Sequence, residues 1–144
     1  MNDLSKENYD FSCYLIKYDC ESIGGLIYQK DSLRSDGEYT VPLIWNYQHY
    51  YPNAVLGTAL LEHREDGVYA YCKFFDNDGG NKARKVLEDY NGSIQLAPYV
   101  NRVKIDGKYV VHGSIRSANL ISDRVDSDDC YRPVMKGKEE GNAN

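Results

Sequence analysis

A repeated pattern of short apolar runs separated by turn residues most constrains the fold of this chain. Two of the separating turns are an acidic residue followed by Gly, Asp66-Gly67 and Asp106-Gly107. Such pairs between β-rich runs predict tight hairpins, because these turns favour residues that adopt positive φ. Runs rich in Val, Ile, Tyr, Phe and Thr cover residues 11–18, 23–29, 40–47, 50–75, 93–105 and 108–121. The pattern therefore predicts a mainly β fold assembled from hairpins.

One stretch has a different period. Apolar residues at positions i, i+3, i+4 and i+7, which form one face of a helix, are Ala83, Val86, Leu87 and Tyr90. Asn77 or Asp78 could cap the start of this helix, and Gly92 follows its end. We expect a helix over about residues 79–90. Helix capping also explains Asp76, Asn77 and Asp78 better than a calcium loop does, because the twelfth position of such a loop would hold Leu87 instead of Glu.

The length of 144 residues suits a single domain. We expect an N-terminal arm at 1–10, a β domain at 11–122 and an extended C-terminal tail at 123–144. The fold class predicted is α+β, mainly β: a small closed or partly open antiparallel β-barrel with one main covering helix. Closing the sheet in this way would remove exposed strand edges.

The composition argues against several functional classes. The net charge is −5 and no basic run is present, so nothing would neutralise a row of phosphates and nucleic-acid binding is not expected. No apolar run approaches the ~20 residues of a membrane span. The first residues lack the basic start and apolar stretch of a signal peptide, so we expect the protein to stay in a reducing cytoplasm.

No metal or cofactor site is expected. The four cysteines, Cys13, Cys20, Cys72 and Cys130, lack CxxC spacing and are interpreted as buried free thiols. The three histidines show no ligand spacing for zinc.

Tyrosine is unusually abundant, with 14 residues. A tyrosine ring with a polar tip suits a contact surface, and it equally suits the strands of a half-exposed sheet, so both interpretations stay open. The candidate interface is the cluster Tyr47, Tyr50 and Tyr51.

Six segments in unbroken order resemble the prohead (capsid maturation) protease family of tailed bacteriophages, which is related in fold to the herpesvirus assemblins. No single segment is specific, but the ordered series is, and it spans most of the chain. The matching segments are 11–19, VPLIWN at 41–46, 55–76, 82–90, IQLAPYVN at 94–101 and VVHGSIRSANLI at 110–121. The resemblance implies the barrel of that protease family.

The family's catalytic pattern is not preserved. It has a histidine directly after the VPLIWN strand, where this chain has Tyr47, although His49 lies two residues on. Ala97 stands at the position of the nucleophilic serine, and Ser117 at the usually acidic third position. A methyl group cannot attack a carbonyl. Pro98 also removes a backbone N–H near the expected oxyanion. The resemblance therefore implies a degenerate member, a pseudoprotease without a catalytic residue.

These departures predict a non-catalytic structural virion protein. We expect a capsid accessory or decoration protein, made in the bacterial host cytoplasm, that binds the major capsid protein or other capsid subunits. Self-association stays open as an alternative contact. The net negative charge of the chain suits an outer position on the shell better than an interior packed with DNA. One alternative is an active maturation serine protease, with Ala97 engineered or with a displaced nucleophile such as Ser93 or Ser114. The other is a transient capsid assembly factor.

Overall fold

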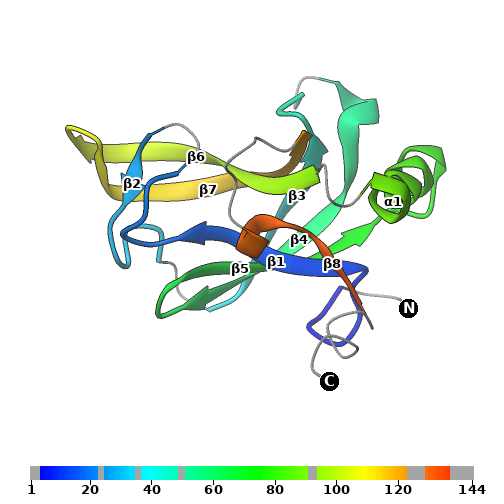
Figure 1. Cartoon of the computed structure of the whole chain (residues 1–144), viewed down its shortest axis with the longest axis horizontal. Coiled ribbons are helices and arrows are strands. Elements are labelled where there is room, and N and C mark those ends of the chain that lie inside the picture. Colours follow the sequence, from blue (N-terminus) through cyan, green and yellow to red (C-terminus); the bar gives the residue numbers. More distant parts are fainter. Residues whose placement is uncertain are drawn as a thin grey trace.

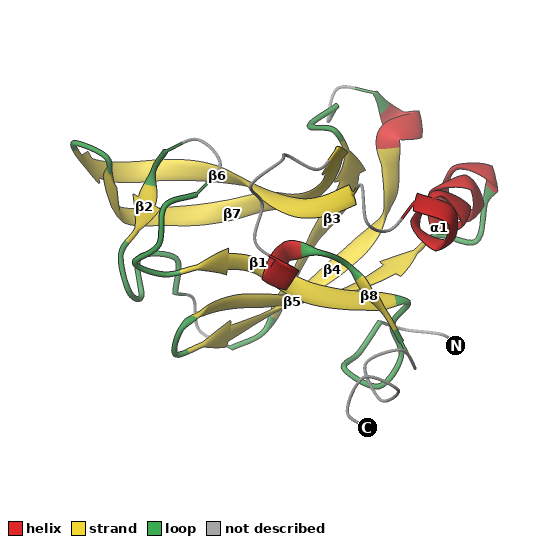
Figure 2. Ribbon diagram, viewed as in Figure 1, coloured by secondary structure: helices red, strands yellow, loops and turns green. Residues whose placement is uncertain are grey.

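The structure is a computed structural model that describes residues 4–22, 25–34, 37–48, 51–90, 94–122 and 129–136. This part of the chain forms one eight-stranded sheet and one α-helix (Figures 1 and 2). The strands are β1 (Phe11–Lys17), β2 (Ile27–Tyr28), β3 (Tyr39–Trp45), β4 (Val55–Arg64), β5 (Gly67–Phe74), β6 (Ile94–Asp106), β7 (Tyr109–Ser122) and β8 (Val134–Met135). The helices are α1 (Asp78–Tyr90) and the short 3-10 turns η1 (Pro52–Ala54) and η3 (Asp129–Tyr131). The predicted mainly β class with one helix is confirmed.

The sheet curls into a half-barrel. Its strand order is β2-β7-β3-β4-β5-β1-β8, and β6 pairs with the other edge of β7. The curl brings β6 close to β1, yet the two strands do not pair in the described part of the chain. Strands β1 and β6 thus border a seam at which the barrel stays open (Figure 1).

The expectation of a purely antiparallel sheet is wrong. β7 pairs in parallel with β3, through Leu43↔Ala118, and with the short β2. Between β3 and β7 the chain reverses direction an even number of times, so these two strands run the same way when the curl brings them together. Local turn signals predict hairpins and carry no information about such a distant pairing.

The two predicted hairpins form, but their glycines act differently. Gly107 has φ of +62°, as an Asp-Gly turn predicts. At the first hairpin neither Asp66 nor Gly67 has a positive φ. Instead, a Cβ at Gly67 would lie 2.1 Å from the backbone oxygen of Ile16. Gly67 is therefore required by the close approach of β1 and not by the turn.

Helix α1 begins and packs much as the sequence predicts. The Asn77 side chain caps it, with Oδ1 accepting a hydrogen bond of 2.8 Å from the backbone N–H of Gly80. Ala83 and Leu87 are buried, and α1 contacts β4 and β5. The helix thereby covers one end of the half-barrel (Figure 2).

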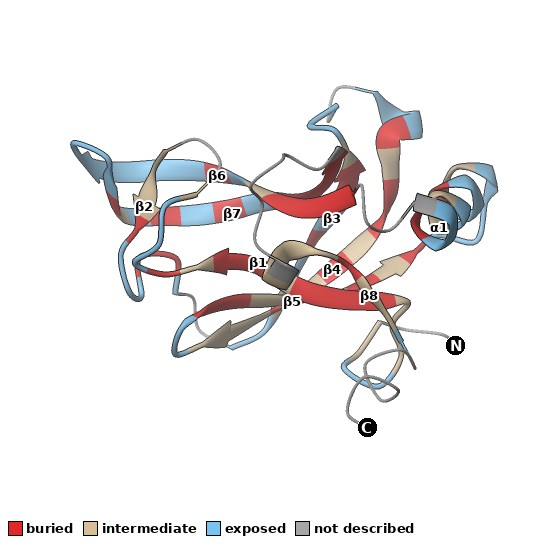
Figure 3. Ribbon diagram, in the orientation of Figure 1, coloured by how far each residue is buried: buried red, intermediate tan, exposed pale blue. Residues whose placement is uncertain are grey.

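The main hydrophobic core lies inside the curl of the sheet, as the buried segments in Figure 3 show. Side chains alternate between the two faces of each strand. The largest fully buried core side chains are Phe11, Leu15, Leu43, Leu61, Leu87, Leu96 and Leu120. Burying each such leucine contributes about 1.5–3 kcal/mol.

Four tyrosines form a ladder on the outer face of β1 and β5. The ring centroids of Tyr69 and Tyr71 lie 5.2 Å apart, Tyr14 meets Tyr69 at 5.0 Å, and Tyr9 meets Tyr71 at 5.1 Å. Arg64 stacks over the Tyr69 ring at 3.7 Å. For these four tyrosines the structure favours the second interpretation, that they suit the strands of a half-exposed sheet, because their rings pair within the sheet.

Both terminal segments are tied to the sheet where they are described. The Lys6 ammonium pairs with Glu38 at 2.7 Å and also with Glu62 of β4. In the C-terminal segment, residues 129–136 form η3 and then β8, which pairs with Phe11 and Ser12 of β1. Residues 123–128 and 137–144 of the predicted tail lie outside the described residues.

Candidate functional site

The three positions singled out from the sequence meet at one buried side chain, Asn119. Its Oδ1 accepts a hydrogen bond of 3.1 Å from the backbone N–H of Tyr47. Its Nδ2 lies 3.1 Å from Ser117 Oγ and 3.5 Å from the backbone oxygen of Ala97. The fold therefore gathers Tyr47, Ala97 and Ser117 from three different strands or strand ends into one cluster, which we call the Asn119 cluster.

Strand pairing sets this geometry. Ala97 of β6 pairs with Asn119 of β7, and Tyr99 pairs with Ser117. Their neighbours Leu96 and Leu120 belong to the main core, so alternation places the side chains of Ala97 and Asn119 on the opposite face. That face is also buried here: Ala97 is 2%, Ser117 3% and Asn119 0% exposed.

Tyr47 reaches the cluster through an unusual backbone. Asn46 and Tyr47 have φ of 50° and 61°, a left-handed conformation that non-glycine residues seldom adopt. The Asn46 N–H donates to the backbone oxygen of Leu120 at 2.9 Å, which holds the end of β3 against β7. The bond from Tyr47 N–H to Asn119 then offsets part of the strain of this turn.

The Asn119 cluster has no nucleophile paired with a base. Ala97 offers only a methyl group. Asn119 Nδ2 is a donor, so the Ser117 hydroxyl oxygen accepts in their bond. An amide cannot take the proton of a serine hydroxyl in the way a histidine does. Within the described residues, no histidine or carboxylate bonds to Ser117 or Asn119.

The thiols offer no replacement nucleophile inside the barrel. Burial raises the pKa of Cys13 and of Cys72, so both remain protonated at neutral pH. Cys13 and Cys72 are buried, but Cys130 is half-buried and Cys20 is exposed, which corrects the expectation that every thiol is buried. Among the described residues, no group of His, Cys, Asp and Glu could hold a metal ion.

The three candidate interface tyrosines are only partly described. His49 and Tyr50 lie outside the described residues. Tyr47 is 38% and Tyr51 64% exposed, and they line different hollows. Tyr47 lines a cavity at the seam between β1 and β6, whereas Tyr51 lines a groove beside α1 with Trp45 and Val86.

Sequence reasoning missed Asn119 itself. The segment Ser117-Ala118-Asn119-Leu120 alternates polar and apolar residues, which normally indicates a strand with one solvent-facing side. In the structure both sides of this strand are buried, and a buried asparagine requires hydrogen-bond partners. The one available signal was an amide side chain within a run of otherwise small or apolar residues.

Comparison with known protein families, with curated proteins and with solved structures found no match for this chain. In the described part of the chain, no helix has the length and apolar character needed to cross a membrane.

Proposed function

We propose that this protein is a non-catalytic structural virion protein, a capsid accessory or decoration protein that binds the major capsid protein shell with a fold of the prohead protease type. The ordered series of segments in the sequence supports this proposal. The mainly β half-barrel with one helix is compatible with such a fold.

The observation that carries the proposal is the Asn119 cluster. Three positions inferred from a degenerate catalytic pattern lie together in space, each hydrogen-bonded to the Asn119 side chain through a backbone or hydroxyl group. The groups found there stabilise the strand packing by hydrogen bonds and contain no nucleophile with a base. A fold can be kept after its catalytic activity is lost, because fold and function are separable. In this proposal the Asn119 amide holds the strands together at the former active site.

A long hairpin supplies a surface for the shell. At the far end of β6 and β7, residues 101–109 are all exposed, so neither face of the ribbon packs on the core. This hairpin arm carries three cations and one carboxylate, in contrast to the net charge of −5 for the whole chain. Its exposed apolar residues are Val103, Ile105 and Tyr109. Apart from the short pairing of β2 with Tyr109 and Val110, the arm is a two-stranded ribbon. Such a ribbon is marginal in water alone, so a partner surface would stabilise it.

Particle composition tests the proposal directly. Purified virions should contain the protein in tens to hundreds of copies per particle (about the number of equivalent sites on a shell), measured by quantitative mass spectrometry. A reconstruction of the particle should place it on the major capsid protein. Its absence from finished virions, with presence only in unexpanded proheads, would instead support the transient assembly factor.

Active-site labelling tests the enzyme alternative. The parent protein and Ala97→Ser would be incubated with a serine-directed acylating reagent and, separately, with capsid precursor. We expect no labelling and no cleavage from either, because a serine placed at 97 would still lack an adjacent base. Labelling of any serine of the parent protein would overturn the non-catalytic proposal in favour of a maturation protease.

A further inference from the structure

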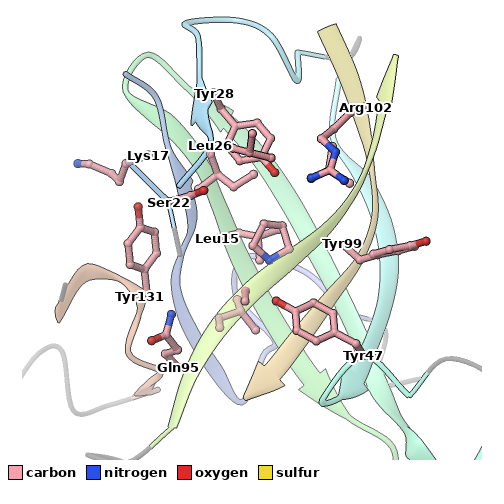
Figure 4. Close-up of a pocket in the computed structure, with 15 residues that line it drawn as sticks. Leu15, Lys17, Ser22, Leu26, Tyr28, Tyr47, Gln95, Tyr99, Arg102 and Tyr131 are labelled. Carbon is pink, nitrogen blue, oxygen red and sulfur yellow. The ribbon is translucent and has the colours of Figure 1, made fainter. Parts of the chain in front are cut away.

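The seam between β1 and β6 contains a cavity of about 290 Å³ (Figure 4). Three parts of the chain form most of its wall: β1, the segment leading into β2, and β6. β1 contributes Leu15 and Lys17, the segment before β2 contributes Leu26, β2 contributes Tyr28, and β6 contributes residues 95–100 with Arg102. Tyr47 and Tyr131 complete it.

The lining of this cavity identifies it as a strand edge. Successive residues of a strand point to opposite faces, so a pocket over one face touches every second residue. Here six consecutive residues of β6 border the cavity. The hollow therefore lies beside the strand, along the edge that β7 does not occupy. Pro98 fits this assignment, because proline is confined to edges or bulges of a sheet.

The two ends of the cavity are polar (Figure 4). Near one end lies Arg102, and among the described residues no carboxylate forms an ion pair with it. Lys17, the other lining cation, is already paired with Asp66 at 2.9 Å. Arg102 and Tyr28 both line the cavity. Burial raises the pKa of Tyr28, and the positive charge of Arg102 opposes this rise.

Near the other end lies Gln95. Gln95 is 1% exposed, and among the residues that the structure describes its Oε1 has no hydrogen-bond partner. A buried amide oxygen without a donor costs about 1–3 kcal/mol, and such groups are rare in native proteins. An N–H group brought by a ligand would satisfy it. This is the second observation, independent of the open edge, that indicates a ligand.

We propose that the seam binds a short extended peptide segment of a partner protein, which adds as a strand to the edge of β6 opposite β7, where no other strand of the described part of the chain pairs. Apolar side chains of the segment would fill the cavity between Leu15 and Leu26, and an acidic side chain would pair with Arg102. A backbone N–H of the segment would donate to Gln95 Oε1. In this mode of recognition, main-chain hydrogen bonds supply the affinity, and the polar groups at the two ends of the cavity supply the selectivity. The proposal does not depend on attachment to a capsid.

A pentapeptide library tests the proposal on the purified full-length protein. The acetylated amides would carry Val, Ile, Leu or Thr at the three central positions, with Asp at either end or Asn in its place. Calorimetry should find members that bind, with Asp preferred about tenfold over Asn for a charge-assisted hydrogen bond. Alternate peptide nitrogens can be N-methylated in two ways, at the odd or at the even positions. One of these two sets should abolish binding, because its methyl groups replace the N–H groups that donate hydrogen bonds to β6.

Three variants complete the test. Arg102→Gln should remove the preference for Asp, whereas Lys104→Gln, the same charge change on the same exposed strand, should keep it. Gln95→Leu should raise the melting temperature of the free protein and weaken peptide binding. The proposal is overturned if no library member binds, if N-methylated peptides bind as well as their parents, or if decanoate competes equally, since the last result would indicate recognition of the apolar cavity alone.

Discussion

Asn119 joins the end of β3 to β6 and β7 through the hydrogen bonds of one side-chain amide. It is fully buried and contacts a backbone N–H, a hydroxyl and a backbone oxygen through one amide group. Loss of the amide would leave the Tyr47 N–H and Ser117 Oγ without this partner in a buried place. Such unsatisfied groups cost more than the hydrogen bonds themselves contribute.

We therefore expect Asn119→Ala to lower the free energy of unfolding by about 2–4 kcal/mol, combining the unsatisfied groups and the small cavity. Asn53→Ala, on an exposed residue of η1, is the control and should change it by less than about 0.5 kcal/mol. Urea unfolding followed by circular dichroism measures both values. Equal effects of the two substitutions would show that the Asn119 cluster does not hold the strands together.

At the scale of elements, close approach between strands determines at which glycines an added side chain would destabilise the fold. Gly67 has an ordinary φ, yet a Cβ there would collide with the β1 backbone. Gly79, in the first turn of α1, has no atom closer than 3.6 Å to an added Cβ. The same substitution should thus have opposite effects at these two sites.

Gly67→Ala should destabilise the protein by more than about 1 kcal/mol, because the backbone of β1 must move. Gly79→Ala should be neutral or stabilise it by up to about 1 kcal/mol, since alanine favours the helix. Thermal unfolding measures the stability of each variant relative to the parent protein. A loss of stability for Gly79→Ala as large as that for Gly67→Ala would contradict this account of the β1–β5 contact.

The N-terminal segment is held to the sheet by charge. Burial alone would raise the pKa of Glu62, but hydrogen bonds from Lys6 and Arg64 outweigh it and hold the pKa below its ordinary value of 4.5. The Arg64 Nε lies 2.5 Å from the Glu62 carboxylate. A lowered pKa in the folded state means that the stabilisation is complete above about pH 4.5 and is lost as the pH falls through the folded-state value.

Glu62→Gln should therefore reduce the loss of unfolding free energy between about pH 6 and about pH 3. Glu65→Gln makes the same charge change on a side chain that is 90% exposed and should leave that loss close to the parent value. Urea unfolding at a series of pH values measures it. An unchanged pH dependence in Glu62→Gln would show that the Lys6–Glu62–Arg64 group contributes nothing to acid sensitivity.

At the scale of the whole molecule, the seam and most of the hairpin arm are stretches of β6 and β7 without a further strand partner in the described part of the chain, although β2 pairs with the arm at Tyr109. The hairpin arm extends away from the core, whereas the seam opens beside it (Figure 1). They lie on the same strand, β6, so one partner could contact both. The arm is the surface that we assign to the shell.

Val103→Glu places a charge on the exposed part of the arm, where the native side chain is 63% exposed. We expect stability within about 0.5 kcal/mol of the parent and loss of co-sedimentation with capsids that lack the native protein. Asn53→Glu, an equal charge change on an exposed residue away from the arm, should retain co-sedimentation. Retention by Val103→Glu would remove the arm from the binding surface.

The sequence alone determined the elements that depend on near neighbours. The Gly107 turn, the Asn77 cap and the buried helical face at Ala83 and Leu87 follow from residues a few positions apart, because backbone dihedral angles and side-chain periodicity are local properties. The ordered segments also predicted that Tyr47, Ala97 and Ser117 belong to one site.

Only the tertiary structure decided the rest. The parallel pairing of β3 with β7, the reason for Gly67 and the burial of Asn119 all arise from contacts between residues far apart in the chain. Alternating polar residues in β7 indicated a solvent-exposed side, and only the packed fold shows that this side is buried. The open edge of β6 likewise depends on how far the sheet curls, which is set by packing of the whole core and not by any local pattern.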